Sequence, residues 1–261
     1  MSYKGSMDLF HALILGVVEG VTEFLPISST GHLIIASKLL GMPQTDFLKT
    51  FEIAIQLGAI LSVVVLYWRS LLVDVEIIKR VAAAFIPTAV LGLIFYKFVK
   101  NVLLGNTHVV LWSLLLGGVV LVIFEMAHRE KRDAIDDIKR MTIMQAVIIG
   151  VFQSLAMVPG VSRSAATIIG GLCLGVSRKV IVEFSFLLAC PTMAAATGLD
   201  LMKSAHDFSA NQFSFLAVGF LAAFAVGVLS IQFLLFFVRN NNFISFGIYR
   251  IIAAVLLFKL L

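Results

Sequence analysis

Charged residues are scarce in this chain of 261 residues: they make up 13% of it, whereas 60% of the residues are hydrophobic. Soluble domains have about 25% charged and about 45–50% apolar residues, so this composition excludes a soluble globular protein. The apolar runs approach the ~20 residues that a helix needs to cross a bilayer, and the alternation typical of a membrane β-barrel is not found. We therefore predict an all-α polytopic membrane protein that forms a single membrane domain over residues 1–261.

Cysteine is equally rare, and the familiar catalytic motifs are missing. Cys173 and Cys190 both lie in apolar segments without CxxC or Cys/His spacing, which excludes a disulfide framework and a structural zinc site. The chain has no P-loop, Rossmann fingerprint, HExxH or GxSxG motif in a suitable context. Any chemistry must therefore come from another arrangement of polar residues.

The net charge of +5 does not indicate a nucleic-acid partner, because the basic residues lie in short loops between apolar runs. The loops within 69–80, 128–140, 176–180 and 239–242 would face one side, and the remaining loops the other. The first side holds Arg69, Lys79, Arg80, Arg129, Lys131, Arg132, Lys139, Arg140, Arg178, Lys179 and Arg239; the second holds Lys4, Lys38, Lys49, Lys97, Lys100, Lys203 and Lys259. The positive-inside rule then predicts that the first side is cytoplasmic.

Two segments, residues 12–41 and 146–175, look like copies of each other. Each consists of two short apolar stretches around a break rich in proline, glycine and serine. Neither stretch is long enough to cross a bilayer, so each copy is predicted to form a re-entrant helical hairpin whose irregular tip is buried in protein or lines a wet cavity.

Six further runs are long enough to be transmembrane helices: 51–68, 81–96, 108–127, 181–199, 214–238 and 243–260. Three of them follow each hairpin. We therefore expect repeat 1 over 8–127, with its hairpin at 9–41, and repeat 2 over 142–261, with its hairpin at 143–175. An odd number of spans turns the second half upside down, which makes an inverted-topology repeat and brings the two hairpin tips together near the midplane. The first hairpin would then open toward the outer side.

Glu19 and Glu23 of the first hairpin are four residues apart, so on a helix both carboxylates project from one face. Ionisable groups at membrane depth indicate function by default. Two neighbouring carboxylates in a low-dielectric site cannot both remain ionised without compensation. A divalent cation, Arg163 or a shared proton could supply that compensation.

A polar sequence, Ser28-Ser29-Thr30-Gly31-His32, follows Pro26 and restarts a helix. Ser28 or Ser29 is suited to cap that helix, and a capped helix N-terminus can bind an anion. His32 lies three residues after Ser29, so its imidazole could exchange a proton with that hydroxyl. The alternatives are serines that only cap the helix and a histidine that is a satisfied buried residue.

The second tip carries Ser162, Arg163 and Ser164 at another helix start. The planar fork of Arg163 suits bidentate phosphate binding, although the arginine could instead be an ion-pair partner of Glu19 or Glu23. Two helix N-termini, an arginine, two carboxylates and a serine–histidine pair together favour a phosphate ester or anhydride as the ligand.

Three strings carry a specific resemblance: EGVTEFLPISSTGH (Glu19 to His32), PGVSRSAATIIGG (Pro159 to Gly171) and EFSFLLACP (Glu183 to Pro191). They resemble the motifs of the undecaprenyl-diphosphate phosphatase family of the bacitracin-resistance type. The resemblance implies a protein of the bacterial inner membrane that removes the terminal phosphate from undecaprenyl diphosphate and so recycles the lipid carrier of cell-wall synthesis. It also implies a divalent cation such as Mg²⁺ or Ca²⁺. One departure is Ala165, where the family usually has glycine.

The resemblance also implies roles for individual residues. The catalytic residues would be Glu19, Glu23, Ser29, His32 and Arg163, with Ser28, Thr30, Ser162 and Ser164 contacting the substrate and Glu19 and Glu23 holding the cation. Either Ser29 attacks the phosphorus, with His32 as base, or a water activated by His32 or a glutamate does so.

A transporter or flippase of undecaprenyl phosphate or another anionic lipid is the alternative function, because secondary carriers also use inverted repeats with broken helices. The expected partners are a prenyl diphosphate substrate and membrane lipid, without nucleic acid. The sequence leaves a homodimer open as the assembly.

Overall fold

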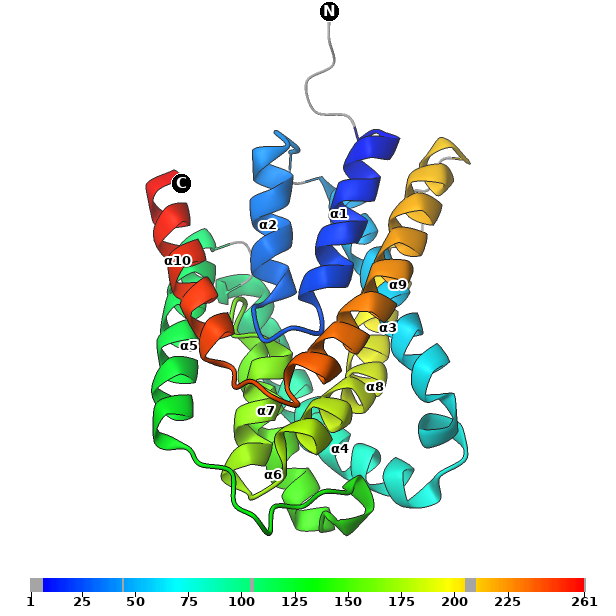
Figure 1. Ribbon diagram of the computed structural model, residues 1–261. Coiled ribbons are helices and arrows are strands. Elements are labelled where there is room, and N and C mark those ends of the chain that lie inside the picture. Colours follow the sequence, from blue (N-terminus) through cyan, green and yellow to red (C-terminus); the bar gives the residue numbers. More distant parts are fainter. Residues whose placement is uncertain (1–6, 44, 104–105, 205–209, 261) are drawn as a thin grey trace, which may run out of the picture.

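A computed structural model describes residues 7–43, 45–103, 106–204 and 210–260, and these residues form helices joined by turns (Figure 1). The α-helices are α1 (Leu9–Thr22), α2 (Ser29–Leu39), α3 (Asp46–Leu72), α4 (Val75–Phe98), α5 (Thr107–Ala127), α6 (Ile143–Ser154), α7 (Arg163–Cys173), α8 (Arg178–Ser204), α9 (Ala210–Phe237) and α10 (Ile244–Leu260). Short irregular turns of helix lie at Val99–Leu103, Ile138–Arg140 and Leu155–Met157. The prediction of an all-α membrane protein is confirmed.

Five helices among the described residues are long and apolar enough to cross a membrane: α3, α4, α5, α8 and α9. They match the predicted spans, although α3, α4 and α8 extend several residues beyond them. The predicted span 243–260 forms α10, whose 17 residues are at the lower limit for crossing the hydrocarbon core. Large apolar side chains such as Leu93, Trp112 and Leu221 are exposed on these helices, as expected for surfaces that face lipid.

The two hairpins, α1–α2 and α6–α7, have matching backbones. Ser28, before α2, has φ of 73° and Ser162, before α7, has φ of 69°; within the described residues these are the non-glycine residues with positive φ. Each hairpin also ends on a glycine with positive φ, Gly41 in the first and Gly175 in the second. These four residues occupy equivalent positions in the two sequence copies, so the similarity in sequence extends to the backbone.

Each hairpin packs against a helix from the other half of the chain: α1 lies along α9, and α6 lies along α4. Small residues permit this close contact, because a Cβ at Gly16 would overlap Gly219 of α9 and a Cβ at Gly150 would overlap Ala84 of α4. Helices α3 and α8 also contact each other, as do α5 and α10. The hairpins approach from opposite ends of the molecule, and their tips meet near its middle (Figure 1).

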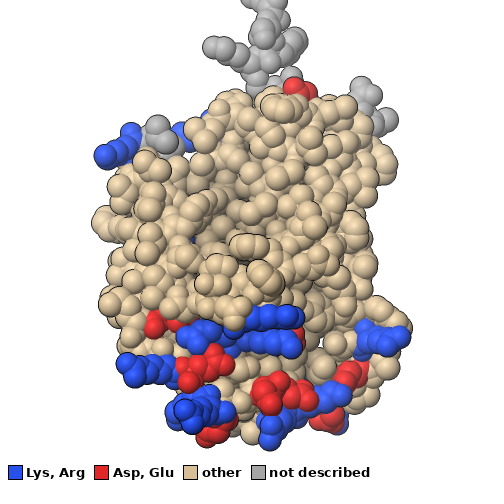
Figure 2. Space-filling view, in the orientation of Figure 1, with Lys and Arg blue, Asp and Glu red and all other residues tan. Residues whose placement is uncertain are grey.

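Charged side chains gather at one end of the molecule, below a broad uncharged surface (Figure 2). Polar contacts join the loops at this end: Lys139 pairs with Asp74, and Arg80 donates to the carbonyl of Met141. Arg178 at the start of α8 contacts Glu125 and Glu130. Three of the four loops that the positive-inside rule assigned to one side, 69–80, 128–140 and 176–180, are therefore joined at this end.

Candidate active site

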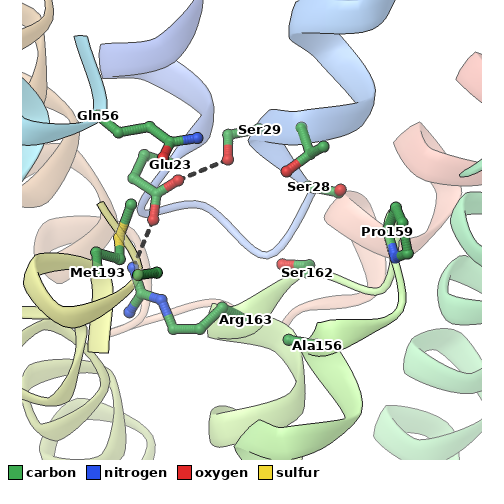
Figure 3. Close-up of a pocket in the computed structure, with 12 residues that line it drawn as sticks. Glu23, Ser28, Ser29, Gln56, Ala156, Pro159, Ser162, Arg163 and Met193 are labelled. Carbon is green, nitrogen blue, oxygen red and sulfur yellow. Dashed lines mark hydrogen bonds and ion pairs between the residues drawn. The ribbon is translucent and has the colours of Figure 1, made fainter. Parts of the chain in front are cut away.

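The two hairpin tips enclose a cavity of about 250 Å³ (Figure 3). Its lining residues come from both tips and from α3 and α8: Glu23, Ser28, Ser29, Thr30, Gln56, Ala156, Pro159, Gly160, Ser162, Arg163, Met193 and Ala196. Helices α2 and α7 both begin at this cavity. Free backbone N–H groups and the positive end of the dipole at a helix start favour an anion, so two such starts give this cavity the features of an anion site.

Glu23 links the two tips (Figure 3). It is the C-cap residue of α1 and is buried. One carboxylate oxygen accepts a hydrogen bond of 2.6 Å from the hydroxyl of Ser29, and the other accepts one of 2.8 Å from Arg163. A carboxylate at the negative end of a helix dipole is unfavourable, so the charge of Arg163 compensates for both the burial and the position.

Arg163 is the first residue of α7, and its guanidinium divides its donors between two partners. Nη2 donates to Glu23, and Nη1 donates to the carbonyl of Ser185 in α8 at 2.6 Å. The Nε–H is buried and has no partner among the described residues. The arginine is thus held in place while one donor remains unused, which fits a group that also binds an anion.

The tip serines and threonine differ in their surroundings. Ser28 occupies the N-cap position of α2 without a side-chain capping bond, whereas the hydroxyl of Ser162 caps α7 through the N–H of Ala165. Thr30 borders the cavity. Ser164 does not line it; its hydroxyl donates instead to the carbonyl of Leu25 at 2.9 Å, which ties the second tip to the first.

His32 lies beside the first tip and outside the cavity lining. Its Nδ1 is 2.8 Å from the carbonyl oxygen of Ser28, and its Nε2 is 2.7 Å from the hydroxyl of Tyr249, on which the imidazole stacks. A carbonyl oxygen can only accept, so Nδ1 carries the proton, and the Nε2 of a neutral ring accepts from tyrosine. The hydroxyl of Ser29 donates to Glu23, and no hydrogen bond between Ser29 and His32 occurs among the described residues.

Known proteins resemble this chain over most of its length. The family model described as "Bacitracin resistance protein BacA" matches residues 12–256. The chain belongs to this family. A protein of Wolinella succinogenes named "Undecaprenyl-diphosphatase" is 51% identical over 96% of this chain and 97% of its own length. Relatives with the same name in Aquifex aeolicus and Thermus thermophilus are 50% and 48% identical, over 94% and 97% of this chain and 96% and 98% of their own lengths.

Glu19 and Glu23 are the residues that would hold the divalent cation implied by the family resemblance. Glu19 is fully buried one turn before Glu23, and neither of its carboxylate oxygens has a partner among the described residues. No cluster of three or more His, Cys, Asp or Glu side chains suited to a metal occurs in the part of the chain that the structure describes. Mg²⁺ is commonly held by one or two carboxylates together with substrate phosphates. Glu23 borders the cavity and Glu19 lies behind it, outside the lining, so the donor type suits such an ion and only Glu23 faces the space where a ligand would lie.

Several contributors to the site were not identified from the sequence. Gln56 of α3 and Met193 of α8 line the cavity, and Ser185 holds Arg163. Tyr249 and Arg250 of α10 both reach the tips. A lone arginine within an apolar run is the signal that could have indicated Arg250.

Proposed function

We propose that this chain hydrolyses undecaprenyl diphosphate to undecaprenyl phosphate and inorganic phosphate in the cavity between the hairpin tips. The main structural support is the 2.6 Å hydrogen bond from Ser29 to Glu23. Arg163, from the other half of the chain, contacts the same carboxylate. Membership of the BacA family, and diphosphatases about 50% identical over nearly the whole chain, support the same activity. A transporter or flippase is not favoured.

The diphosphate would lie between the starts of α2 and α7, with its lipid tail leaving sideways into the bilayer between helices. Arg163 and the free N–H groups at the two helix starts would bind the phosphate oxygens. Ser28, Thr30 and Ser162 border the same space and would supply further hydrogen bonds. Ser164 would contribute indirectly, because its hydroxyl is engaged with Leu25.

In the reaction we favour, Ser29 Oγ attacks the terminal phosphorus while its proton passes to Glu23 Oε2. The bond between that phosphorus and the bridging oxygen breaks, and undecaprenyl phosphate leaves. Water then attacks the phosphoserine while Glu23 returns its proton to the departing Ser29 Oγ. Inorganic phosphate leaves with the protons of the attacking water, and the Ser29 hydroxyl and the Glu23 carboxylate are restored. Arg163 stabilises the negative charge on the transferring oxygens throughout.

The remaining predicted residues would act around this centre. Glu23, with Glu19 behind it, would hold Mg²⁺ or Ca²⁺, which when bound neutralises charge on the diphosphate. His32 would hold the carbonyl of Ser28, and so maintain the unusual backbone of the tip. Strained backbone of this kind concentrates at functional sites.

We further propose that α10 is a sixth transmembrane helix, that α1–α2 and α6–α7 are re-entrant hairpins, and that the two halves form an inverted repeat in the bacterial inner membrane. Three features support this arrangement: the reciprocal packing of each hairpin against the opposite half, the matching positive-φ serines and the charged end in Figure 2. With the charged end in the cytoplasm, the first hairpin opens toward the outer side.

The activity is tested by measuring phosphate release from undecaprenyl diphosphate by purified protein in detergent, with and without a chelator. We expect cation-dependent release by the wild type. Ser29→Ala should lower kcat by at least about 100-fold, because it removes the attacking hydroxyl. Ser37→Ala is the matched control, since Ser37 is a buried serine of the same helix outside the cavity.

Full activity of Ser29→Ala would overturn the serine mechanism and favour direct attack by water. The absence of phosphate release by folded wild-type protein would overturn the phosphatase itself, and transport of undecaprenyl phosphate would then become the better hypothesis.

A further inference from the structure

Arg250 is a charged residue in the middle of α10, a helix that is otherwise almost entirely apolar. Its side chain is fully buried and is the largest of the fully buried side chains. Among the described residues no carboxylate pairs with it. A buried, unpaired arginine is expensive unless other groups satisfy its charge, so its surroundings require an explanation.

Backbone carbonyl groups from three separate segments satisfy this arginine. Nη1 donates to Pro26 of the first tip at 3.4 Å and to Val161 of the second tip at 3.3 Å. Nη2 donates to Gly160 of the second tip at 2.9 Å and to Ser113 of α5 at 3.1 Å, and Nε donates to Leu114 of α5 at 3.3 Å. One guanidinium therefore bridges both tips and fixes them to α5.

The fold leaves room for this guanidinium. A Cβ at Gly117 of α5 would overlap the Nη2 and Cζ atoms of Arg250, and a Cβ at Gly118 would approach its Cβ. The preceding residue, Tyr249, contacts His32 beside the first tip. Adjacent residues of α10 thus reach the first tip at two points.

We propose that Arg250 is a positioning residue that holds the two hairpin tips at the separation that the site requires. Pro26 and Gly160 each lie two residues before a serine with positive φ. Arg250 therefore donates hydrogen bonds to each tip just before the start of α2 or α7. If either tip moved away, the buried guanidinium of Arg250 would lose hydrogen-bond acceptors. The free-energy cost of that loss opposes the movement. The consequence for catalysis rests on the proposed phosphatase activity, but the positioning itself does not.

The experiment compares Arg250→Met and Arg250→Lys with wild type by hydrogen–deuterium exchange in detergent and by phosphate release. In Arg250→Met we expect faster amide exchange over residues 24–31 and 158–165, without faster exchange in α3 and α9. We expect kcat/KM to fall by about 100-fold, the loss that a displacement of about 1 Å produces at an active site. Arg250→Lys should lie between the two, since its ammonium keeps the charge but has fewer donors in a different geometry.

Arg178→Met is the matched control, because Arg178 is also a largely buried arginine but pairs with Glu125 and Glu130 at the charged end. It should loosen that end and leave exchange at the tips unchanged. Gly117→Ala keeps the arginine and crowds its guanidinium, so it should accelerate exchange at the tips in the same way. If Arg250→Met yields no folded protein, Gly117→Ala and Arg250→Lys are used to test the proposal.

Unchanged exchange at both tips in the folded Arg250 variants and in Gly117→Ala would overturn the proposal. Uniformly faster exchange along the chain would do so as well, because it would indicate a general structural role. If the wild type released no phosphate, the proposed function would fail, whereas the exchange experiment would still decide the role of Arg250.

Discussion

The hairpins α1–α2 and α6–α7 have similar backbones and different side chains. Both place a serine with positive φ before the second helix and a glycine with positive φ after it. At matching positions the first hairpin has Glu19, Glu23, Ser29 and His32, and the second has Gln153, Met157, Arg163 and Ala166. The backbone conformation is found in both copies. At these matching positions the two carboxylates and Ser29 occur only in the first copy, and the arginine occurs only in the second.

This difference shows how a repeated shape can form a single site. Two helix starts, one from each copy, face the same cavity, which is the arrangement proposed to bind an anion. The groups proposed to move a proton and to neutralise charge are divided between the copies. Glu23 and Arg163 then join the two by an ion pair of 2.8 Å, so neither hairpin is complete without the other.

The largest difference in activity is expected between substitutions at the matched residues Glu23 and Met157. Glu23→Gln removes the proton acceptor of Ser29 and the charge partner of Arg163, and should lower kcat by about 10²–10⁴-fold, the usual contribution of a general base. Met157→Leu alters the equivalent residue of the second hairpin and should leave kcat nearly unchanged. Steady-state phosphate release by both variants makes the comparison, and similar losses in the two would show that the hairpins do not divide their roles in this way.

A smaller effect is expected at the other matched pair, Glu19 and Gln153. Gln153 is buried, and its amide nitrogen donates to the hydroxyls of Thr88 and Thr192 at 2.9 and 3.0 Å. Its Oε1 and both oxygens of Glu19 lack a partner among the described residues, so Glu19 has no hydrogen bond through its side chain there and Gln153 has two. Gln153→Leu should therefore lower the free energy of unfolding by about 1–3 kcal/mol without changing the dependence of activity on the cation.

Thermal unfolding in detergent, together with a titration of Mg²⁺ against activity, checks this prediction. Glu19→Gln is the counterpart and should raise the concentration of cation required. A change in cation dependence for Gln153→Leu, with none for Glu19→Gln, would reverse the assignment of the two residues.

The smallest effect belongs to the charged end, away from both tips. The hydrogen bond from Lys139 to Asp74, at 2.6 Å, is the main reason that the pKa of Asp74 lies below its ordinary value of 3.8. A carboxylate with a lowered pKa stabilises the fold at pH values above its ordinary pKa, and the stabilisation is lost as the pH falls through the lowered value.

Asp74→Asn should therefore reduce the Tm slightly at neutral pH and flatten its decline in acid, because the bridge is exposed and contributes little. Activity per folded molecule should remain that of the wild type. A substantial loss of activity in this variant would mean that the charged end is coupled to the tips, contrary to the account.

Most of the helical arrangement could be predicted from the sequence, because apolar length and proline–serine breaks are local signals. Predicted spans such as 108–127 differ by only a residue from the helix observed, Thr107–Ala127. The reciprocal packing of the hairpins was not predictable in detail. It depends on pairs such as Gly16 with Gly219, which become neighbours only when distant helices meet.

The sequence predicted many of the residues that lie at the candidate site, but not the contacts between them. Helix spacing put His32 on the same face of α2 as Ser29, but that spacing cannot give the rotation of α2 relative to α1. In the structure the chain passes through Ser28 with a positive φ, Ser29 contacts Glu23 and His32 contacts Tyr249. No role for Arg250 was predicted, because the apolar run around it indicated only a transmembrane helix.

The central claim is that the two tips form one site through Glu23 and Arg163. A double-mutant cycle on kcat/KM tests it most directly, using Glu23→Gln, Arg163→Gln and the double variant. When two residues act as one unit, the effects of substituting them do not add. The double variant should therefore have about the same kcat/KM as the less active of the two single variants. Losses that multiply would contradict the account, because they would mean that the two residues act independently.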